Sequence, residues 1–166
     1  KTERKFEEIN EGKVFPAKYD RRHDLSLVAN YDINKRWSVG GAFVFATGNT
    51  MTLPNAWYMH QQGLLFQYGE RNSIRMAPYH RLDLSVTWYD KEYKEKNDPA
   101  TGELVSVKKR FRSNWVLSVY NVYSRANPFF MYVDNDGSFS GGDFQVKVKQ
   151  VSLFPIIPSI TWNFEF

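Results

Sequence analysis

Apolar and polar residues alternate along five segments of this chain, and this alternation restricts the fold more than any other feature of the sequence. The segments cover residues 23–33, 37–48, 81–89, 114–123 and 158–166. Because successive side chains of a β-strand point to opposite faces, a period of two predicts strands with one apolar and one polar face. The apolar residues nowhere keep a helical spacing for long. We therefore predict an all-β protein whose five long strands form an antiparallel up-and-down meander.

Composition excludes several classes of protein. Aromatic residues make up 17% of the 166 residues, yet no run of about 18 apolar residues exists that could form a transmembrane helix. Cysteine is absent, which excludes a disulfide framework and a thiolate metal site. The net charge of +4 is dispersed, and its densest cluster, at 108–112, is typical of the charged flank of a turn. We expect no nucleic-acid partner.

Two environments explain alternating strands. In a soluble sandwich or barrel, the apolar face points inward to a core. In an outer-membrane barrel, the apolar face points outward to lipid and the polar face lines the lumen. Periodicity alone does not distinguish these two arrangements, but the positions of the aromatic residues do.

The aromatic residues favour the membrane barrel. In a meander, each of the five strands places one aromatic residue of its apolar face at the same end of the sheet. The residues of this predicted periplasmic-side belt are Tyr31, Trp37, Trp88, Trp115 and Trp162. A second set near the opposite ends consists of Phe43, Phe45, Tyr79, Tyr123, Phe129, Phe130 and Phe154. Amphipathic rings concentrate at the headgroup level of a bilayer, whereas a soluble core has no reason to gather them at one level.

The lengths of the links predict an orientation. The short turn DINKR joins the first two strands, while the long links at 48–80 and 125–144 lie at the other ends of the strands. Bacterial barrels have short periplasmic turns and long extracellular loops, so we expect the C-terminus in the periplasm. The link at 90–113 is too long for such a turn. Its segments KEYKEK and LVSVKKRF predict a two-stranded ribbon that extends into the periplasm.

Five strands are too few to close a membrane barrel, because the smallest such barrels use eight and no open sheet edge can face lipid. We therefore expect residues 1–166 to be the C-terminal arc of a larger outer-membrane barrel, or one chain of an assembled barrel. The first residues, KTERKFEEIN, contain neither an initiator Met nor a secretion signal. This fits a mature product or a piece of a longer protein.

Several motifs resemble a known family. The stretches FPAKYDRRHDLSLVANY, ATGNTMTLP, YHRLDLSVTW, VLSVYNVYSRANPFF and VSLFPIIPSITWNFEF look like the closing strands of TonB-dependent outer-membrane transporters of the Bacteroidota, over about residues 15–166. SVYNVYSR resembles the penultimate-strand motif of that family. The terminal alternation resembles the signal read by the barrel-assembly machinery. This resemblance assigns the signal to Trp162, Phe164 and Phe166.

The resemblance implies a function and partners. Members of the family are 22-stranded barrels that contain a plug domain and import scarce ligands with energy relayed by TonB. The implied partners are the lipid bilayer, the remaining barrel strands and plug, TonB and the barrel-assembly machinery, with a surface lipoprotein as a further candidate. The implied location is the outer membrane of a Gram-negative cell. Two alternatives remain open: an outer-membrane barrel part that serves adhesion or assembly, and a soluble β-barrel binding protein.

No sequence pattern supports catalysis. The chain contains no Ser–His–Asp spacing, phosphate loop or carboxylate pair, so we expect neither enzyme activity nor a cofactor. His23, His60 and His80 follow no metal-ligand spacing, and we expect no metal site.

Two groups of residues have expected roles, and only the first is expected to contact a ligand. The candidate ligand contacts are Trp57, Tyr58, Met59 and His60, in an expected outer loop. The polar faces of the strands carry Asp24, Asn30, Asp32, Asp83 and Tyr89, which we expect to hydrate the barrel wall or to contact a plug.

Two residues break the alternation. Asn121 falls on the face that is otherwise apolar, which a bulge or a position above the membrane would explain. Pro158 lies within the last strand, where it removes a backbone donor, and it predicts a second bulge.

Overall fold

The computed structural model describes residues 1–61, 63–99, 102–137 and 144–166. Within these residues the chain forms β-strands and one 3-10 turn, η1 (Asn10–Gly12), and no α-helix. None of the described segments is a helix that is long and apolar enough to cross a membrane. The predicted all-β class is confirmed.

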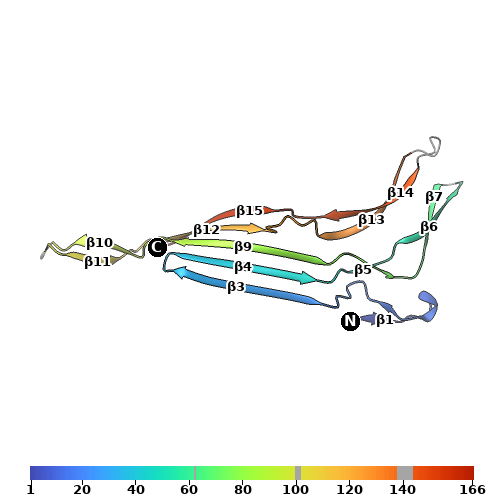
Figure 1. Ribbon diagram of the computed structural model, residues 1–166, viewed down its shortest axis with the longest axis horizontal. Helices are drawn as coiled ribbons and strands as arrows, with labels where there is room; N and C mark the ends of the chain where they lie inside the picture. The colour runs from blue at the N-terminus through green and yellow to red at the C-terminus, as the bar shows by residue number, and fades with distance from the viewer. Residues whose placement is uncertain (62, 100–101, 138–143) are drawn as a thin grey trace. The chain divides into compact units, whose positions relative to one another are not determined.

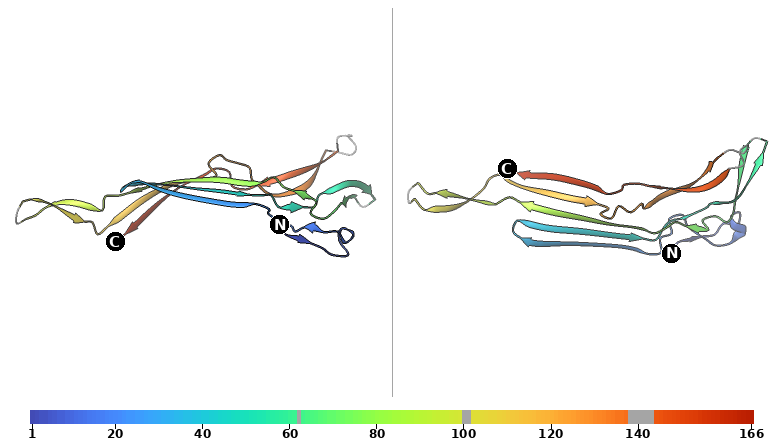
Figure 2. Two further views of the ribbon diagram at one scale, coloured as in Figure 1. Left: turned by 60° about the horizontal axis from the view of Figure 1, so that its bottom comes forward. Right: turned by 45° about the horizontal axis from the view of Figure 1, so that its top comes forward.

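The main sheet contains five antiparallel strands in the order β15-β12-β9-β4-β3, which follows the sequence (Figure 1). Its strands are β3 (Asp24–Asn34), β4 (Trp37–Ala46), β9 (Tyr79–Tyr89), β12 (Arg112–Tyr120) and β15 (Ile157–Glu165). They coincide with the five alternating segments, and Figure 2 shows them side by side in two further views. The predicted meander of five long strands is confirmed.

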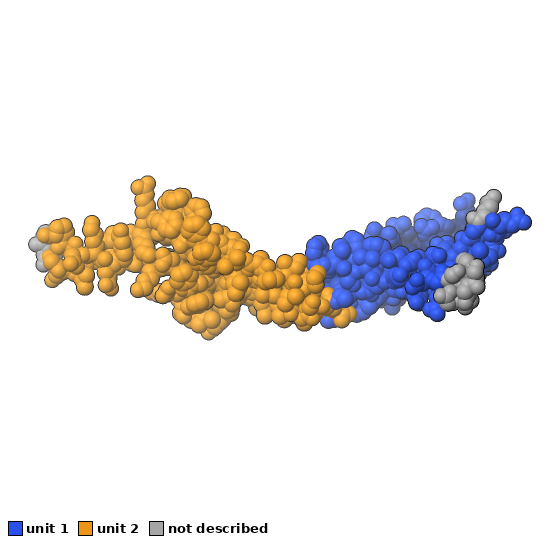
Figure 3. Space-filling model, turned by 90° about the horizontal axis from the view of Figure 1, so that it is seen from above, with its two compact units in different colours: residues 1–25, 44–80, 126–154 blue, residues 26–43, 81–125, 155–166 orange. Residues whose placement is uncertain are grey.

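The chain divides into two compact units, which Figure 3 colours separately. Unit 1 consists of residues 1–25, 44–80 and 126–154, and unit 2 of residues 26–43, 81–125 and 155–166. Most of the main sheet belongs to unit 2, while short ends of β3, β4 and β9 belong to unit 1.

The predicted ribbon in the link at 90–113 is confirmed. β10 (Tyr93–Asn97) pairs with β11 (Leu104–Lys108) in an antiparallel hairpin of unit 2. Its register runs from Tyr93 opposite Lys108 to Asn97 opposite Leu104.

The two other long links contain strands that the sequence did not predict. In unit 1 they form the antiparallel pairs β5 (Thr50–Met51) with β8 (Ile74–Arg75), β6 (Pro54–His60) with β7 (Gly63–Tyr68), and β13 (Pro128–Asp136) with β14 (Gln145–Ser152). A further short pair joins β1 (Glu3–Arg4) to β2 (Phe15–Pro16). Four residues of the second aromatic set lie outside the main sheet: Phe129 and Phe130 in β13, Tyr123 after the end of β12, and Phe154 between β14 and β15.

The buried apolar residues that the structure describes lie in unit 1. Its buried residues include Phe15, Ala17 and Ala46 together with the polar residues Asp20 and Thr50. The five strands of the main sheet are described completely, and Ala46 is the one buried residue among them. As far as the described residues go, the main sheet is thus a single layer without a core on either face.

An ion pair fixes the core of unit 1. Asp20 is 1% exposed, and it accepts hydrogen bonds from the backbone N–H of Thr2 and, at 2.6 Å, from the guanidinium of Arg75. Arg75 also donates to the carbonyl of Gly48 at 2.7 Å. The Thr2 hydrogen bond, followed by the Arg75 hydrogen bond, lowers the pKa of Asp20 below its usual value. A carboxylate with a depressed pKa stabilises the folded state above its ordinary pKa, and this stabilisation disappears as the pH falls through the folded-state pKa.

Removal of the Arg75 cation tests this pair. We expect Arg75→Gln to raise the pKa of Asp20 toward the ordinary value of 3.8, so that unit 1 unfolds at a higher pH during acid titration. The measurement is a carbon NMR titration of the Asp20 carboxyl. Arg21→Gln is the matched control, because Arg21 faces the exposed Asp24 at 3.8 Å. An unchanged pKa of Asp20 in Arg75→Gln would contradict the assignment.

The break at Asn121 marks the end of β12. Asn121 follows Tyr120, the last residue of that strand, and has a φ of 53°, in the left-handed region. Its side-chain amide donates to the carbonyl of Arg125 at 3.0 Å, and its side-chain oxygen accepts the Arg125 N–H at 3.1 Å. The alternation stops at Asn121 because the strand ends there and a tight loop begins.

The bulge predicted at Pro158 is wrong. Pro158 lies opposite Val119, and the register between β12 and β15 is unbroken from Ile157 to Glu165. Pro158 is the second residue of β15, which forms an edge of this sheet. A missing N–H is tolerated at the start of an edge strand.

Candidate functional site

One face of the main sheet is apolar across its strands. Val86 of β9, Leu117 of β12 and Ile160 of β15 lie opposite one another. Leu84 lies opposite Val119 on the same face. The alternation of each strand therefore becomes a continuous apolar surface, because the register aligns the apolar positions of neighbouring strands.

This apolar face is exposed. The exposed fractions reach 54% at Leu117 in the middle of the sheet and 69% at Ile160 on the edge strand. Five strands about 4.8 Å apart, with about nine residues at 3.3 Å each, give a face of roughly 700 Å². The largest apolar patch on a typical soluble monomer is about 300–600 Å². The face therefore requires an apolar medium or partner.

Tryptophan residues form a row at one end of this face. Trp88, Trp115 and Trp162 lie opposite one another on β9, β12 and β15, and the rings of Trp115 and Trp162 stack with centroids 5.8 Å apart. Trp37 begins β4, and the N–H of Tyr89 donates to the carbonyl preceding it at 2.8 Å, which places Trp37 at the same end.

The aromatic row extends to further rings. Phe111 contacts Trp162, Phe164 and Phe166 with ring centroids 6.4, 6.3 and 5.7 Å apart. Tyr31, the fifth residue of the predicted belt, lies three residues before the end of β3. Its place in the aromatic row stays a prediction.

The opposite face of the main sheet is polar and carries small side chains. Ser85, Ser118 and Ser159 lie opposite one another, and the hydroxyls of Ser118 and Ser159 are hydrogen-bonded at 2.7 Å. A Cβ atom at Gly40 would lie 2.7 Å from the Ser85 hydroxyl and 2.8 Å from the side-chain oxygen of Asn30. Both polar groups therefore lie directly above this glycine on the polar face. These residues line a shallow hollow across the strands. Its hydroxyl and amide groups suit contact with water.

A charged cluster lies at one end of the polar face. Arg81 donates to Asp83 at 2.9 Å, and its guanidinium lies 4.0 Å from the ring centroid of Tyr120. Asp83 also accepts the backbone N–H of Asn121 at 2.9 Å. Of this cluster, only Asp83 was predicted from the sequence, as a residue of the polar face. Its partners were not recognised, because they come from β9 and from the end of β12. The cluster joins β9 to the end of β12 and satisfies its own charges.

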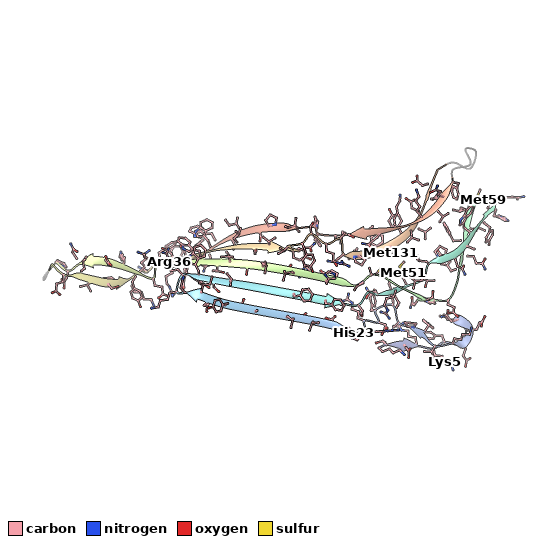
Figure 4. All side chains as sticks on the ribbon, viewed as in Figure 1. Lys5, His23, Arg36, Met51, Met59 and Met131 are labelled. Carbon is pink, nitrogen blue, oxygen red and sulfur yellow. The ribbon has the colours of Figure 1, made fainter. Side chains whose placement is uncertain are left out.

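The four candidate ligand contacts do not form one surface. Trp57 and Met59 point to one face of the β6–β7 hairpin, opposite Phe66 and Leu64, whereas Tyr58 and His60 point to the other face. Met59 is labelled on this hairpin in Figure 4. The ring of Trp57 packs edge-on against Phe144 at 5.0 Å. Trp57 and Met59 therefore share one face of the hairpin, and Tyr58 and His60 share the other.

The described residues contain no group of three or more potential metal ligands. His80 stacks on Phe45 with ring centroids 6.5 Å apart, and its backbone N–H donates to the side-chain oxygen of Asn127 at 3.0 Å. His23 contributes backbone hydrogen bonds to Thr47. These two histidines therefore have structural surroundings at the ends of strands.

No family model, no curated protein and no solved structure matches this chain.

Proposed function

We propose that this chain forms an arc of the wall of an outer-membrane β-barrel. The apolar face of the main sheet contacts the lipid hydrocarbon, and the polar face lines a lumen that contains water. The observation that carries this proposal is the chemistry of a single-layer sheet: one face is apolar and exposed, and the other carries mainly small and polar side chains. A bilayer supplies the apolar medium that the first face requires.

The dimensions of the sheet support the proposal. Its strands contain 11, 10, 11, 9 and 9 residues. A tilted strand needs about 9–11 residues to cross a bilayer. The tryptophan row lies at one end of these strands, where a bilayer places its aromatic interface.

The two outer strands of the main sheet need further partner strands in a barrel. β3 and β15 each have one edge without a partner strand in the described chain. Unpaired backbone groups are costly in lipid, so both edges pair with further barrel strands in the assembled protein. The β10–β11 hairpin then extends beyond the tryptophan row into the periplasm.

Within this class, we propose import of a scarce ligand as part of a TonB-dependent transporter of a Gram-negative outer membrane. The support is the resemblance of the strand motifs and of the terminal aromatic alternation. The roles of TonB, of a plug and of the assembly signal at Trp162, Phe164 and Phe166 belong to this proposal. A plug sequence in the same native polypeptide would decide between import and a purely structural or adhesive barrel.

Spin labels on neighbouring residues test the facing of the sheet. We expect a label at position 84 to be accessible to oxygen dissolved in lipid and a label at position 85 to be accessible to a water-soluble nickel reagent, because Leu84 and Ser85 point to opposite faces. The measurement is electron paramagnetic resonance on the native polypeptide in lipid vesicles. The reverse pattern, or recovery of the folded protein in water without detergent, would overturn the proposal.

A further inference from the structure

We propose that Arg36, stacked on Trp88, binds the phosphate of a phospholipid headgroup at the tryptophan row of the sheet. This inference rests on the proposed function, because it places the apolar face in a bilayer. It adds a specific lipid contact to a surface that otherwise makes only nonspecific apolar contacts.

Stacking on Trp88 holds the guanidinium of Arg36 on the apolar face of the sheet. Figure 4 labels Arg36 at the end of the sheet where the turn between β3 and β4 lies. Its guanidinium carbon lies 5.3 Å from the centroid of the Trp88 ring. Because Trp88 belongs to the apolar face, the guanidinium lies on that face, at the level of Trp115 and Trp162. Stacking on an aromatic ring restricts the orientation of a guanidinium.

The hydrogen bonds of Arg36 leave its outer edge available. Its Nε donates to the carbonyl of Tyr89 at 3.5 Å. Among the residues that the structure describes, no hydrogen bond or ion pair involves either terminal amino group of Arg36. Two parallel N–H groups on a guanidinium match two oxygens of a phosphate. The free edge of Arg36 therefore suits this anion.

Nearby carboxylates do not neutralise Arg36. Asp90, which follows the Tyr89 that accepts the Arg36 hydrogen bond, pairs with Lys109 at 2.9 Å. The Lys109 hydrogen bond is the main cause that lowers the pKa of Asp90, and Arg36 contributes a weaker Coulombic effect. Asp90 therefore stays ionised with Lys109 as its direct partner.

The surrounding charge also favours an anion. Residues 35–36, 90–92 and 108–112 together with Glu165 contain seven basic and three acidic side chains, an excess of four positive charges. In a bilayer, the chemical layer next to an interfacial row of tryptophans is the phosphate layer. Cationic side chains at this level recognise lipid headgroups.

Short-chain lipids provide the test. The native polypeptide, folded in a neutral detergent, is titrated with dioctanoylphosphatidylglycerol, with dioctanoylglycerol, which has no phosphate, and with inorganic phosphate. Bound lipid is counted by native mass spectrometry. We expect Arg36→Gln to weaken binding of the phospholipid roughly tenfold, as for loss of a charge-assisted bidentate contact at a partly exposed site. Binding of dioctanoylglycerol should not change.

Two variants serve as controls. Lys35→Gln removes the same charge from the same turn without touching Trp88 and should change binding by less than about twofold. Arg36→Lys keeps the charge but loses the planar fork, and should lie between wild type and Arg36→Gln. Equal losses in Arg36→Gln and Lys35→Gln would overturn the inference. Competition by inorganic phosphate at equal concentration would show a site for the free anion and would also overturn it.

Flotation with phosphatidylglycerol vesicles separates the two proposals. If wild-type protein floats with the vesicles and Arg36→Gln binds phospholipid as wild type does, the Arg36 site fails and the membrane face stands. If folded wild-type protein does not float, the proposed function fails and the Arg36 site fails with it.

Discussion

Leu117→Arg is expected to destabilise the folded protein by about 2–4 kcal/mol in a lipid bilayer, because it places a cation near the middle of the lipid-facing surface. Leu117 is 54% exposed and lies between Val86 and Ile160 in the register of the sheet, with no polar partner on that face. The measurement is a reversible denaturant titration of the native polypeptide in lipid vesicles.

Val116→Arg is the matched control for this prediction. Val116 precedes Leu117 on the same central strand, but it points to the polar face, where it lies between Thr87 and Thr161. An arginine there reaches water, and the expected cost is below about 1 kcal/mol. Hydrophobicity alone predicts similar effects of the two changes, since both replace an aliphatic side chain. Equal losses of unfolding free energy would mean that the assigned facing is wrong.

Gly48→Ala is expected to cost at least about 3 kcal/mol in the local stability of unit 1, because overpacking against backbone atoms cannot be relieved by a side-chain rotation. A Cβ atom at Gly48 would lie 2.0 Å from the carbonyl oxygen of Met76 and 2.7 Å from that of Ala77. The backbone around it is already bonded, since the Met76 N–H donates to Asn49 at 2.9 Å. Relief of the overlap must therefore separate these segments.

Hydrogen exchange measures the effect of Gly48→Ala directly. The amides of Thr50 and Met76 are hydrogen-bonded to Lys18 and Asn49 in the folded unit, so their exchange should accelerate by about two orders of magnitude or more. Gly69→Ala is the control, because its Cβ would meet only the amide end of the Asn55 side chain at 3.0 Å. Similar protection in Gly48→Ala and wild type would show that the close approach to Met76 is not required.

Local patterns account for what the sequence predicted correctly. A period of two is a property of successive residues, so the five long strands and their two faces follow without knowledge of any partner strand. The β10–β11 ribbon was also predictable, because its link was too long for a simple turn and contained two short segments of strand-like residues. The resemblance of the motifs suggested the class of barrel, and the proposed function still depends on it.

The β6–β7 hairpin of unit 1 was not predicted because its strands do not alternate. On β6 and β7, apolar side chains occupy both faces: Trp57 opposite Phe66 on one, and Tyr58 opposite Leu65 on the other. Such a segment has no clear period, and a strand of this kind is recognised only once its partner is known. For the same reason, the candidate ligand residues seemed to form one group in the sequence but divide between two faces in the structure.

The strands of the main sheet and the face of each side chain could be predicted from the sequence, because both depend on neighbours along the chain. Which side chains meet depends on the packing of distant strands. The tryptophan row depends on the register between β9, β12 and β15, and the pair of Asp20 with Arg75 joins residues that are 55 positions apart. Arg36 reaches Trp88 only because the sheet places a turn beside a strand 52 positions later. Such contacts depend on long-range pairing, whose energy is shared among many residues and is encoded in no single segment.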